Sequence, residues 1–418
     1  MAENLTQRAI LVEISKSNEQ LNNCKVSLRE LAELLDTAGG EVVGELVQIK
    51  PSYDASTCIG SGKVEELSEL CKNEKANLVV FDNELSPSQI RNIEEKLGGD
   101  VRVIDRSMLI LDIFALHAKT GEGKLQVELA QLKYTAPRLI GKGAELSRQG
   151  GKIGTRGPGE SQLESDKRHL KRRIDALEAE LEQMVRTRMT MRAARDRSGL
   201  PKIAIVGYTN AGKSTLLNTL TDAGVLSENK LFATLDPTTR RLTLADGEDV
   251  LLTDTVGFIR NLPHHLIKAF RSTLDEAAYS DIILIIADIT DPECSEHLKI
   301  TQELLETLGA GEKPTVIAYN KCDALETPFI PNTDNSVAIS ARTGEGIDSL
   351  LQRLLFIIRN SKRRLTLLFP YDAQSELNSL YAVAKVEDVN YTDTGAEVVA
   401  ILDKKTEGKY KIYIKNDK

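Results

Sequence analysis

The sequence predicts an α/β protein in four parts, and three observations lead to that prediction. Apolar strands alternate with helices over residues 1–105, which is typical of a small α/β domain. Leucine stripes at helical spacing over residues 106–200 indicate an antiparallel helical hairpin. A strand, a glycine-rich loop and a helix open residues 201–360, and a smaller α/β unit is expected over residues 361–418.

The composition is that of an ordinary globular chain. Its 418 residues are 41% hydrophobic and 28% charged, which is enough for two or three compact domains. The net charge of −8 does not indicate a nucleic-acid binder, so an RNA contact would need a local basic patch. The five cysteines form no C-x-x-C pair, which predicts neither a disulfide framework nor a zinc site. No apolar run approaches the roughly 18 residues of a membrane span, and we expect a protein that is not secreted.

Residues 1–105 are expected to contain four strands with helices between them. We place the strands at 5–14, 42–49, 78–81 and 101–105, and the helices at 27–38, from 59 onward and at 87–97. The first strand is expected at the edge of its sheet, and Ser27 and Ser86 are suited to cap the helices that follow them. The run Gly60-Ser61-Gly62-Lys63 lacks the spacing of a phosphate-binding loop, so we interpret it as a glycine turn into a helix.

Residues 106–200 predict helices over 108–117, 125–139 and 162–195, the last two forming the hairpin. The loop between them, 141–160, is too long and too rich in glycine to be a passive connection. It carries Lys142, Arg148, Lys152 and Arg156. A basic loop at a hairpin tip can follow an RNA backbone, and the alternative is a solvated linker. A second basic run, Lys167 to Arg173, either contacts RNA or forms a solvated helix face.

A phosphate-binding loop follows the apolar strand 203–206. Its residues are Gly207, Tyr208, Thr209, Asn210, Ala211, Gly212, Lys213 and Ser214, with Thr215 in the helix that follows. The two glycines let the backbone turn its N–H groups toward a phosphate, and the helix start adds its dipole. The Lys213 ammonium can reach the β- and γ-phosphates, and the Ser214 hydroxyl can ligate Mg²⁺.

Three later motifs stand in the order and context of a GTPase. Asp254 ends a strand and can hold Mg²⁺ through water, while the N–H of Gly257 can reach the γ-phosphate. Asp323, in Asn320-Lys321-Cys322-Asp323, can pair with N1–H and the 2-amino group of guanine, and Lys321 can stack on the base. The backbone of Ser340, Ala341 and Arg342 is expected to contact the guanine oxygen. The motifs together predict a Ras-like P-loop GTPase domain that binds GTP or GDP.

Residues at three positions of the nucleotide domain bear on the expected mechanism. A switch threonine should close over Mg²⁺ when GTP is bound. We assign this role to Thr238, with Thr239 and Thr234 as alternatives. The predicted catalytic residues are therefore Lys213, Thr238 and Gly257. Phe258 stands where many small GTPases have a water-orienting glutamine, which predicts slow hydrolysis until a partner acts. Asn210 stands where some GTPases hold K⁺ against the phosphates, so K⁺ stimulation is a hypothesis.

Nearly the whole chain resembles the HflX family of GTPases. The resemblance rests on the residues at 59–63, 123–132, 154–160, 232–238 and 254–258. It implies a cytoplasmic factor that binds the large (50S) ribosomal subunit, splits stalled or idle ribosomes and is stimulated by the ribosome. The hairpin loop would reach the peptidyl-transferase region of the large-subunit rRNA. Some relatives are described as binding ATP through the N-terminal domain. Ser161 and Ser165 stand where threonine is expected.

Other classes of function remain open at this stage. One is a GTPase that acts in ribosome assembly or tRNA modification. GTPases of the tRNA-modifying kind have an asparagine at the position of Asn210 and an apolar residue at the position after Gly257, as this chain does. That kind should also carry a folate-type domain and a cysteine near its C-terminus, whereas no cysteine follows Cys322 here. Another is a scaffold that binds GTP without needing turnover. We expect a monomer that binds no DNA.

Overall fold

The computed structural model describes residues 7–148, 158–197, 199–221, 231–232, 237–263, 266–267, 270–381 and 383–415. The chain divides into two compact units. The first unit contains Met1–Met184, Leu226–Asp236 and Val256–Leu274. The second contains Val185–Val225, Pro237–Thr255 and Asp275–Lys418. Leu226–Asp236, which precedes Thr238, and Val256–Leu274, which follows Asp254, therefore belong to the same unit as the N-terminal sheet. Thr238 and Asp254 are the residues predicted to act at the magnesium site.

The first unit is built on a four-stranded parallel sheet. Its strands are β1 (Gln7–Ser15), β2 (Gly40–Ile49), β3 (Leu78–Phe81) and β4 (Arg102–Asp105), in the order β2-β1-β3-β4. The four predicted strands are confirmed, but the edge position of the first is wrong. Residues 9 to 12 of β1 are fully buried, because neighbouring strands and covering helices surround a central parallel strand on every side.

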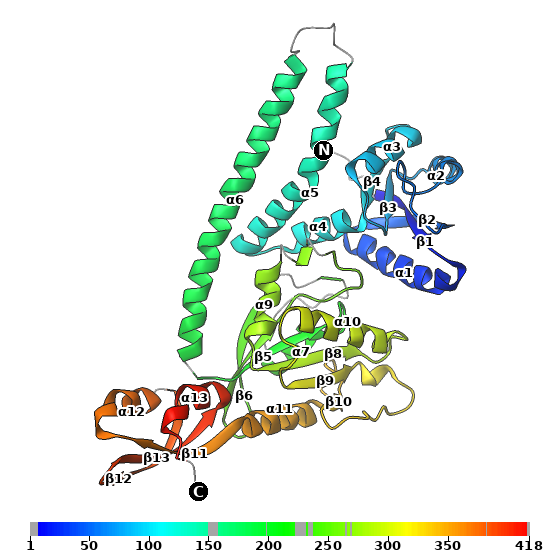
Figure 1. Cartoon of the computed structure of the whole chain (residues 1–418). Helices are drawn as coiled ribbons and strands as arrows, with labels where there is room; N and C mark the ends of the chain where they lie inside the picture. The colour runs from blue at the N-terminus through cyan, green and yellow to red at the C-terminus, as the bar shows by residue number, and fades with distance from the viewer. Residues whose placement is uncertain are drawn as a thin grey trace. The chain divides into compact units, whose positions relative to one another are not determined.

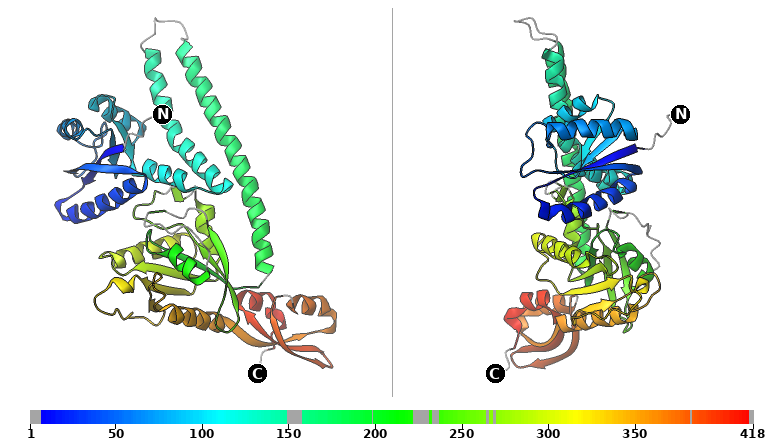
Figure 2. Two further views of the ribbon diagram at one scale, coloured as in Figure 1. Left: turned by 180° about the vertical axis from the view of Figure 1, so that it is seen from behind. Right: turned by 90° about the vertical axis from the view of Figure 1, so that its right-hand side faces the viewer.

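Helices cover both faces of this sheet (Figure 2). They are α1 (Leu21–Thr37), α2 (Ser61–Glu74), α3 (Pro87–Leu97) and α4 (Arg106–His117). The cap at Ser86 is confirmed as a capping box with Gln89, and the glycine turn before α2 is confirmed. The cap at Ser27 is wrong. The buried stripe of α1 extends back to Cys24, so the helix begins at Leu21 and the Ser27 hydroxyl donates to Asp82 at 2.7 Å.

Two long helices, α5 (Gly121–Arg148) and α6 (Pro158–Arg197), form the predicted hairpin (Figure 1). Ion pairs join them, from Lys133 to Glu178 at 2.6 Å and from Arg173 to Glu128 at 2.6 Å. The predicted loop over 141–160 is partly wrong, because 141–148 and 158–160 have helical backbone. Glycine weakens a helix by only about 1 kcal/mol relative to alanine, which a long helix tolerates. Lys152 and Arg156 lie outside the described residues.

The second unit contains a six-stranded sheet in the order β10-β9-β8-β5-β7-β6. The strands are β5 (Lys202–Gly207), β6 (Thr238–Thr243), β7 (Asp249–Asp254), β8 (Ile282–Asp288), β9 (Thr315–Asn320) and β10 (Ser336–Ala338). Among them only β6 is antiparallel to its neighbour. The helices include α7 (Lys213–Thr221), α10 (Cys294–Thr307) and α11 (Ile347–Ser361), while α9 (Arg271–Tyr279) joins the two units.

The chain ends in a three-stranded antiparallel sheet in the order β11-β13-β12. Its elements are β11 (Lys362–Phe369), α12 (Gln374–Tyr381), β12 (Lys385–Thr392), β13 (Gly395–Asp403) and α13 (Lys404–Lys409). The sequence pattern of this unit predicts a helix at about 371–382 and strands at 384–390, 396–402 and 409–414. The helix and the first two strands are confirmed, and the third strand is wrong. The apolar side chains of Leu367 and Phe369 make β11 the better partner for β13, and both are buried.

The described residues include no helix long and apolar enough to cross a membrane. All five cysteines are unpaired, and burial raises the pKa of the Cys58, Cys71 and Cys294 thiols to about 11. These thiols are therefore neutral at physiological pH and behave as small apolar side chains.

Candidate nucleotide-binding site

The sheet order of the second unit brings the predicted nucleotide motifs to one edge. The neighbouring parallel strands β9, β8, β5 and β7 end at Asn320, Asp288, Gly207 and Asp254. The carboxyl ends of parallel strands share one edge, and that edge is where open α/β sheets bind their ligands. The phosphate-binding loop, Asp254 and the guanine motif are thus gathered as the sequence predicts.

The two loop glycines have no room for a side chain. Gly207 has φ +149° and a Cβ there would lie 2.2 Å from the Ile286 carbonyl oxygen. Gly212 has φ +96° and a Cβ there would lie 2.2 Å from Asn320 Nδ2. Backbone approach this close requires glycine, so both positions are fixed by packing as well as by phosphate chemistry.

Lys213 lies buried inside its own loop. Its ammonium donates to the carbonyl oxygens of Gly207 at 3.2 Å and Tyr208 at 2.9 Å. Burial lowers the pKa of Lys213 to about 8, and the Asp254 carboxylate opposes that shift. The side chain is thus a preorganised cation, held where loop N–H groups and a helix N-terminus favour an anion.

Ser214 and Asp254 form a pair of hard oxygen donors. The Ser214 hydroxyl donates to Asp254 Oδ2 at 2.7 Å, and Asp254 is fully buried. A hydroxyl and a carboxylate beside a phosphate-binding loop fit the ligand preferences of Mg²⁺, which takes few protein oxygens and completes its shell with phosphate and water. No group of three or more His, Cys, Asp or Glu side chains in the described part of the chain is arranged to hold a metal.

Asn320 joins the phosphate-binding loop to the last motif. Its Nδ2 donates to the Ala211 carbonyl at 2.8 Å, and its Oδ1 accepts from the Ala341 N–H at 2.9 Å. Sequence reasoning assigned Asn320 to the nucleotide. The structure shows that its amide is engaged with two backbone segments of the protein, and it therefore sets their spacing.

The Asp323 carboxylate, predicted from the sequence to select guanine, is charged and already has partners in the protein. A hydrogen bond from Ser340 and the Arg342 guanidinium hold the pKa of Asp323 below its usual range. Arg342 is largely exposed and forms an ion pair with Asp323, so a guanine would compete with that guanidinium. Lys321 lies 2.6 Å from Asp288 Oδ2, an ion pair that the sequence analysis missed. An acid at the carboxyl end of a buried strand was the signal that could have found Asp288.

Tyr208 contributes to the site through its backbone. Its ring stacks on His297 of α10, with centroids 3.7 Å apart and an interplanar angle of 9°. His297 was not singled out from the sequence, since a lone histidine on a helix carries no motif. Thr209 is buried beside it, and Asn210 follows with φ +60°, a left-handed conformation that asparagine tolerates.

The candidates for the switch threonine have different surroundings. Thr238 is the first residue of β6 and lies opposite Asp254 in the ladder. The Thr239 and Thr253 hydroxyls lie 3.0 Å apart, within hydrogen-bond distance. Thr234 lies outside the described residues. Gly257 and Phe258 belong to the first unit, and Phe258 is buried there.

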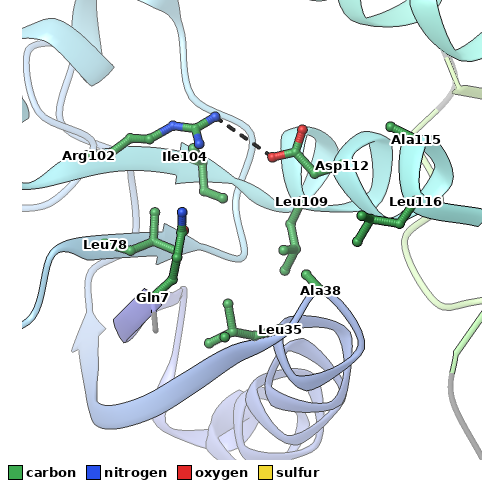
Figure 3. A pocket seen from close by; sticks show the side chains of 11 residues that line it. Gln7, Leu35, Ala38, Leu78, Arg102, Ile104, Leu109, Asp112, Ala115 and Leu116 are labelled. Atoms are coloured by element: carbon green, nitrogen blue, oxygen red, sulfur yellow. Dashed lines mark ion pairs between the residues drawn. The ribbon is translucent and has the colours of Figure 1, made fainter. Parts of the chain in front are cut away.

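The first unit also contains a cavity of about 340 Å³ (Figure 3). Its lining consists of Gln7, Leu35, Ala38, Gly40, Leu78, Arg102, Ile104, Leu109, Asp112, Ala115 and Leu116. Gln7, Leu78 and Arg102 begin their strands, so the cavity lies at the amino edge of the sheet, opposite the edge that binds ligands in such folds. Its ion pair, Arg102 with Asp112 at 3.8 Å, is internal, and we assign no ligand to it.

Comparison with known proteins decides the family. Three family models match in succession: "GTP-binding GTPase N-terminal" over 25–115, "GTP-binding GTPase Middle Region" over 117–195 and "50S ribosome-binding GTPase" over 202–321. The GTPase HflX of Caldanaerobacter subterraneus subsp. tengcongensis is 48% identical over 395 residues, which cover 94% of this chain and 90% of that protein. The chain belongs to the HflX family of GTPases.

A second HflX protein agrees with this assignment. The GTPase HflX of Escherichia coli (strain K12) is 42% identical over 367 residues, covering 86% of this chain and 85% of that protein. A crystal structure of a GTP-binding protein from Sulfolobus solfataricus in complex with GDP is 26% identical, covers 84% of this chain and 98% of that one, and has a TM-score of 0.45. As an HflX GTPase, the chain is an enzyme that binds and hydrolyses GTP.

Proposed function

We propose that this GTPase binds the large (50S) ribosomal subunit and separates stalled or idle ribosomes into subunits, with hydrolysis stimulated by the ribosome. The proposal is carried by the α5–α6 hairpin, whose second helix has a basic face, in a chain whose nucleotide domain matches the family described as a 50S ribosome-binding GTPase. A factor that binds one subunit more tightly than the intact ribosome shifts the equilibrium toward separated subunits.

The basic face of α6 is well placed for a phosphate backbone. Its exposed cations include Lys167, Arg168, Lys171 and Arg172. Pairs of residues four apart lie on one side of a helix, so these side chains form a single patch. Arg173 is different, because its guanidinium bonds Glu128 of α5 at 2.6 Å and joins the two helices instead. Neutralising several phosphates in this way would make ribosome binding sensitive to salt.

The nucleotide site supplies the chemistry through charge and position. Lys213 and the loop N–H groups would neutralise the phosphates, and the Gly257 N–H would contact the γ-phosphate. Ser214 and the switch threonine, which is Thr238 or its alternatives Thr239 and Thr234, would hold Mg²⁺, and Asp254 would contact it through water. When bound, Mg²⁺ would neutralise developing charge on the β- and γ-phosphates. Asp323 would select guanine over adenine.

Two residues set the expected rate. Phe258 cannot orient a water molecule, so hydrolysis should be slow until a partner rearranges the switch segments or supplies a polar group. Asn210 would place a side-chain oxygen near the phosphates, where K⁺ would act in place of an arginine finger. The left-handed backbone at Asn210 is a second reason for asparagine there.

The test is GTP hydrolysis with and without 50S subunits in K⁺ buffer, alongside light scattering of intact ribosomes. We expect strong stimulation and falling scattering. Lys167→Glu with Lys171→Glu should abolish both, whereas the matched exposed pair Lys299→Glu with Lys385→Glu should change them little. Stimulation without a fall in scattering would leave a ribosome-bound GTPase that does not split. Absence of both would exclude the ribosome as the partner and favour another RNA or protein.

A further inference from the structure

The phosphate-binding loop is in contact with α10, a helix that carries no nucleotide motif. The contact is the stack between the rings of Tyr208 and His297, whose centroids lie 3.7 Å apart and whose planes differ by 9°. Tyr208 is only 7% exposed, so its ring is enclosed by the protein. Because protein interiors are close-packed, a flat ring enclosed against a second flat ring has few positions open to it. The stack therefore limits where the backbone of Tyr208 can lie.

The imidazole of His297 is itself held in place by α10 and the turn before it. Cys294 and Thr301, three residues before it and four after it, lie on the same side of the helix and are buried. The Thr301 hydroxyl donates to the His297 carbonyl at 2.8 Å. Asp291 Oδ2 lies 3.7 Å from Nδ1 of the imidazole, and Glu293 Oε2 lies 4.0 Å from Nε2. The histidine is therefore a firm support for the loop.

The backbone of the stacked tyrosine binds the lysine of the loop. The Tyr208 carbonyl oxygen accepts from Lys213 Nζ at 2.9 Å and from the Ala211 N–H at 3.3 Å. The other carbonyl that binds Lys213 belongs to Gly207, which is the last residue of β5 and is held by the sheet. Tyr208 lies just beyond the strand, so the position of its carbonyl depends more on the packing of its ring.

We propose that His297 is a positioning residue for GTP hydrolysis: by stacking on Tyr208, it fixes the carbonyl that holds the Lys213 ammonium where the phosphates bind. The proposal rests on the proposed role of Lys213 in neutralising the phosphates. A preorganised cation favours phosphoryl transfer because it needs no rearrangement as charge develops. A displacement of about 1 Å, caused by a change remote from the reacting atoms, is enough to slow a reaction. His297 thus acts on the reaction through Tyr208.

The first experiment tests whether a flat ring at position 297 is needed, using the purified full chain without ribosomes. We expect His297→Ala to lower kcat/KM for GTP by about three- to tenfold, the range that an aromatic pair contributes. His297→Phe keeps a flat ring and should restore most of the rate, whereas His297→Leu fills the space without stacking and should not. Lys299→Ala, at an exposed position of the same helix, is the control and should be neutral. Equal losses in the Phe and Ala variants would overturn the proposal.

A double-mutant cycle tests whether the effect passes through Lys213. The affinity for a non-hydrolysable GTP analogue is measured for His297→Ala, for Lys213→Ala and for the chain with both changes. We expect His297→Ala to weaken binding in the wild-type background and to cause no further loss once the ammonium is absent. No loss in the single variant, or an undiminished loss in the double variant, would overturn the proposal. An undiminished loss would mean that the histidine supports the loop as a whole.

Failure of the proposed role of Lys213 can be distinguished from failure of the role of His297. If Lys213→Ala binds the analogue as tightly as the wild-type chain, the role of Lys213 is excluded, and the positioning role with it. If Lys213→Ala loses affinity while His297→Ala does not, only the positioning role is overturned. Urea unfolding shows whether each variant folds. If His297→Ala folds poorly, the Phe and Leu variants decide the question, because both fill the space of the histidine.

Discussion

The side-chain amide of Asn320 donates to the carbonyl of Ala211, 109 residues earlier, at 2.8 Å. The same side chain accepts from the Ala341 N–H, so one residue of the guanine motif connects the phosphate-binding loop to the last nucleotide motif. Gly212 packs against this amide so closely that no Cβ fits. A buried side chain therefore fixes the spacing between the loop predicted to bind the phosphates and the motif predicted to contact the base.

Asn320→Ala should therefore weaken both GTP and GDP by about tenfold or more. It leaves a buried carbonyl and a buried N–H without partners, which costs about 1–3 kcal/mol each. Calorimetric titration with both nucleotides measures the effect. Asn335→Ala, which removes an exposed contact to Arg353, serves as the control and should be nearly neutral. A large loss for one nucleotide alone would contradict the linking role.

Asp323→Asn should lower the affinity for GTP by about ten- to a hundredfold, because a charged hydrogen-bond acceptor facing two guanine donors is replaced by an amide. The new N–H₂ group can donate to a carbonyl at position 2 of a purine. The variant should therefore gain affinity for xanthosine triphosphate. Competition between the two triphosphates tests this directly, and equal losses for both would place Asp323 outside the base site.

Ser214→Ala should raise the Mg²⁺ concentration needed for half-maximal hydrolysis by about tenfold or more, since it removes the hydroxyl proposed as a direct ligand. The same titration on alanine variants of Thr234, Thr238 and Thr239 identifies the switch threonine. Thr239→Ala should have little effect, because its hydroxyl lies within hydrogen-bond distance of the Thr253 hydroxyl in the sheet. An unchanged Mg²⁺ requirement in all three would show that the metal takes no threonine ligand from this segment.

Asn210→Gly distinguishes two reasons for an asparagine at this position, a side-chain oxygen that binds K⁺ and a backbone in the left-handed conformation. Glycine accepts the left-handed φ of +60° without strain, so the loop should keep its shape while the side-chain oxygen is removed. We expect the variant to bind GTP normally and to lose any difference between hydrolysis rates in K⁺ and in Na⁺. Wild-type rates that are equal in the two salts, with and without 50S subunits, would exclude the K⁺ hypothesis.

Glu13→Gln should stabilise the protein at alkaline pH and change little at acid pH. Burial, and then the nearby Asp82 carboxylate, raise the pKa of Glu13 from 4.5 to about 7. Between those values the folded chain keeps a proton that the unfolded chain has lost, so the free energy of unfolding contributed by this group falls as pH rises. A hydrogen bond with Cys24 and the charge of Arg106 oppose this rise in pKa only in part, and within the described chain Glu13 Oε2 has no hydrogen-bond partner.

The expected gain for Glu13→Gln is about 2 kcal/mol at pH 8, at roughly 1.4 kcal/mol per pKa unit with allowance for residual solvent screening. Urea denaturation of wild type and variant at pH 5 and pH 8 measures it. The exposed Glu45→Gln on β2 is the matched control. A variant that is equally stable or less stable than wild type at pH 8 would show that Glu13 is ionised in the fold at little cost.

The sequence by itself determined the features that depend on local geometry. The phosphate-binding loop needs only two glycines, a lysine and a serine at fixed spacing between a strand and a helix, and the structure places them so. The helix over 87–97 carries its own start and stop signals, Ser86 with Gln89 and then Gly98, and its bounds match the prediction. Such features are readable because the interacting groups are neighbours along the chain.

Only the tertiary structure decided which elements are neighbours in space. Apolar periodicity predicts that a strand is buried but not by what, so the central position of β1 and the pairing of β11 with β13 could not be predicted. Ser27 has the chemistry of a helix cap, yet its hydroxyl binds Asp82 because α1 packs against that strand end. The bond from Arg106 to the Arg260 carbonyl spans 154 residues. Contacts of that range depend on the packing of the whole unit, which no local pattern encodes.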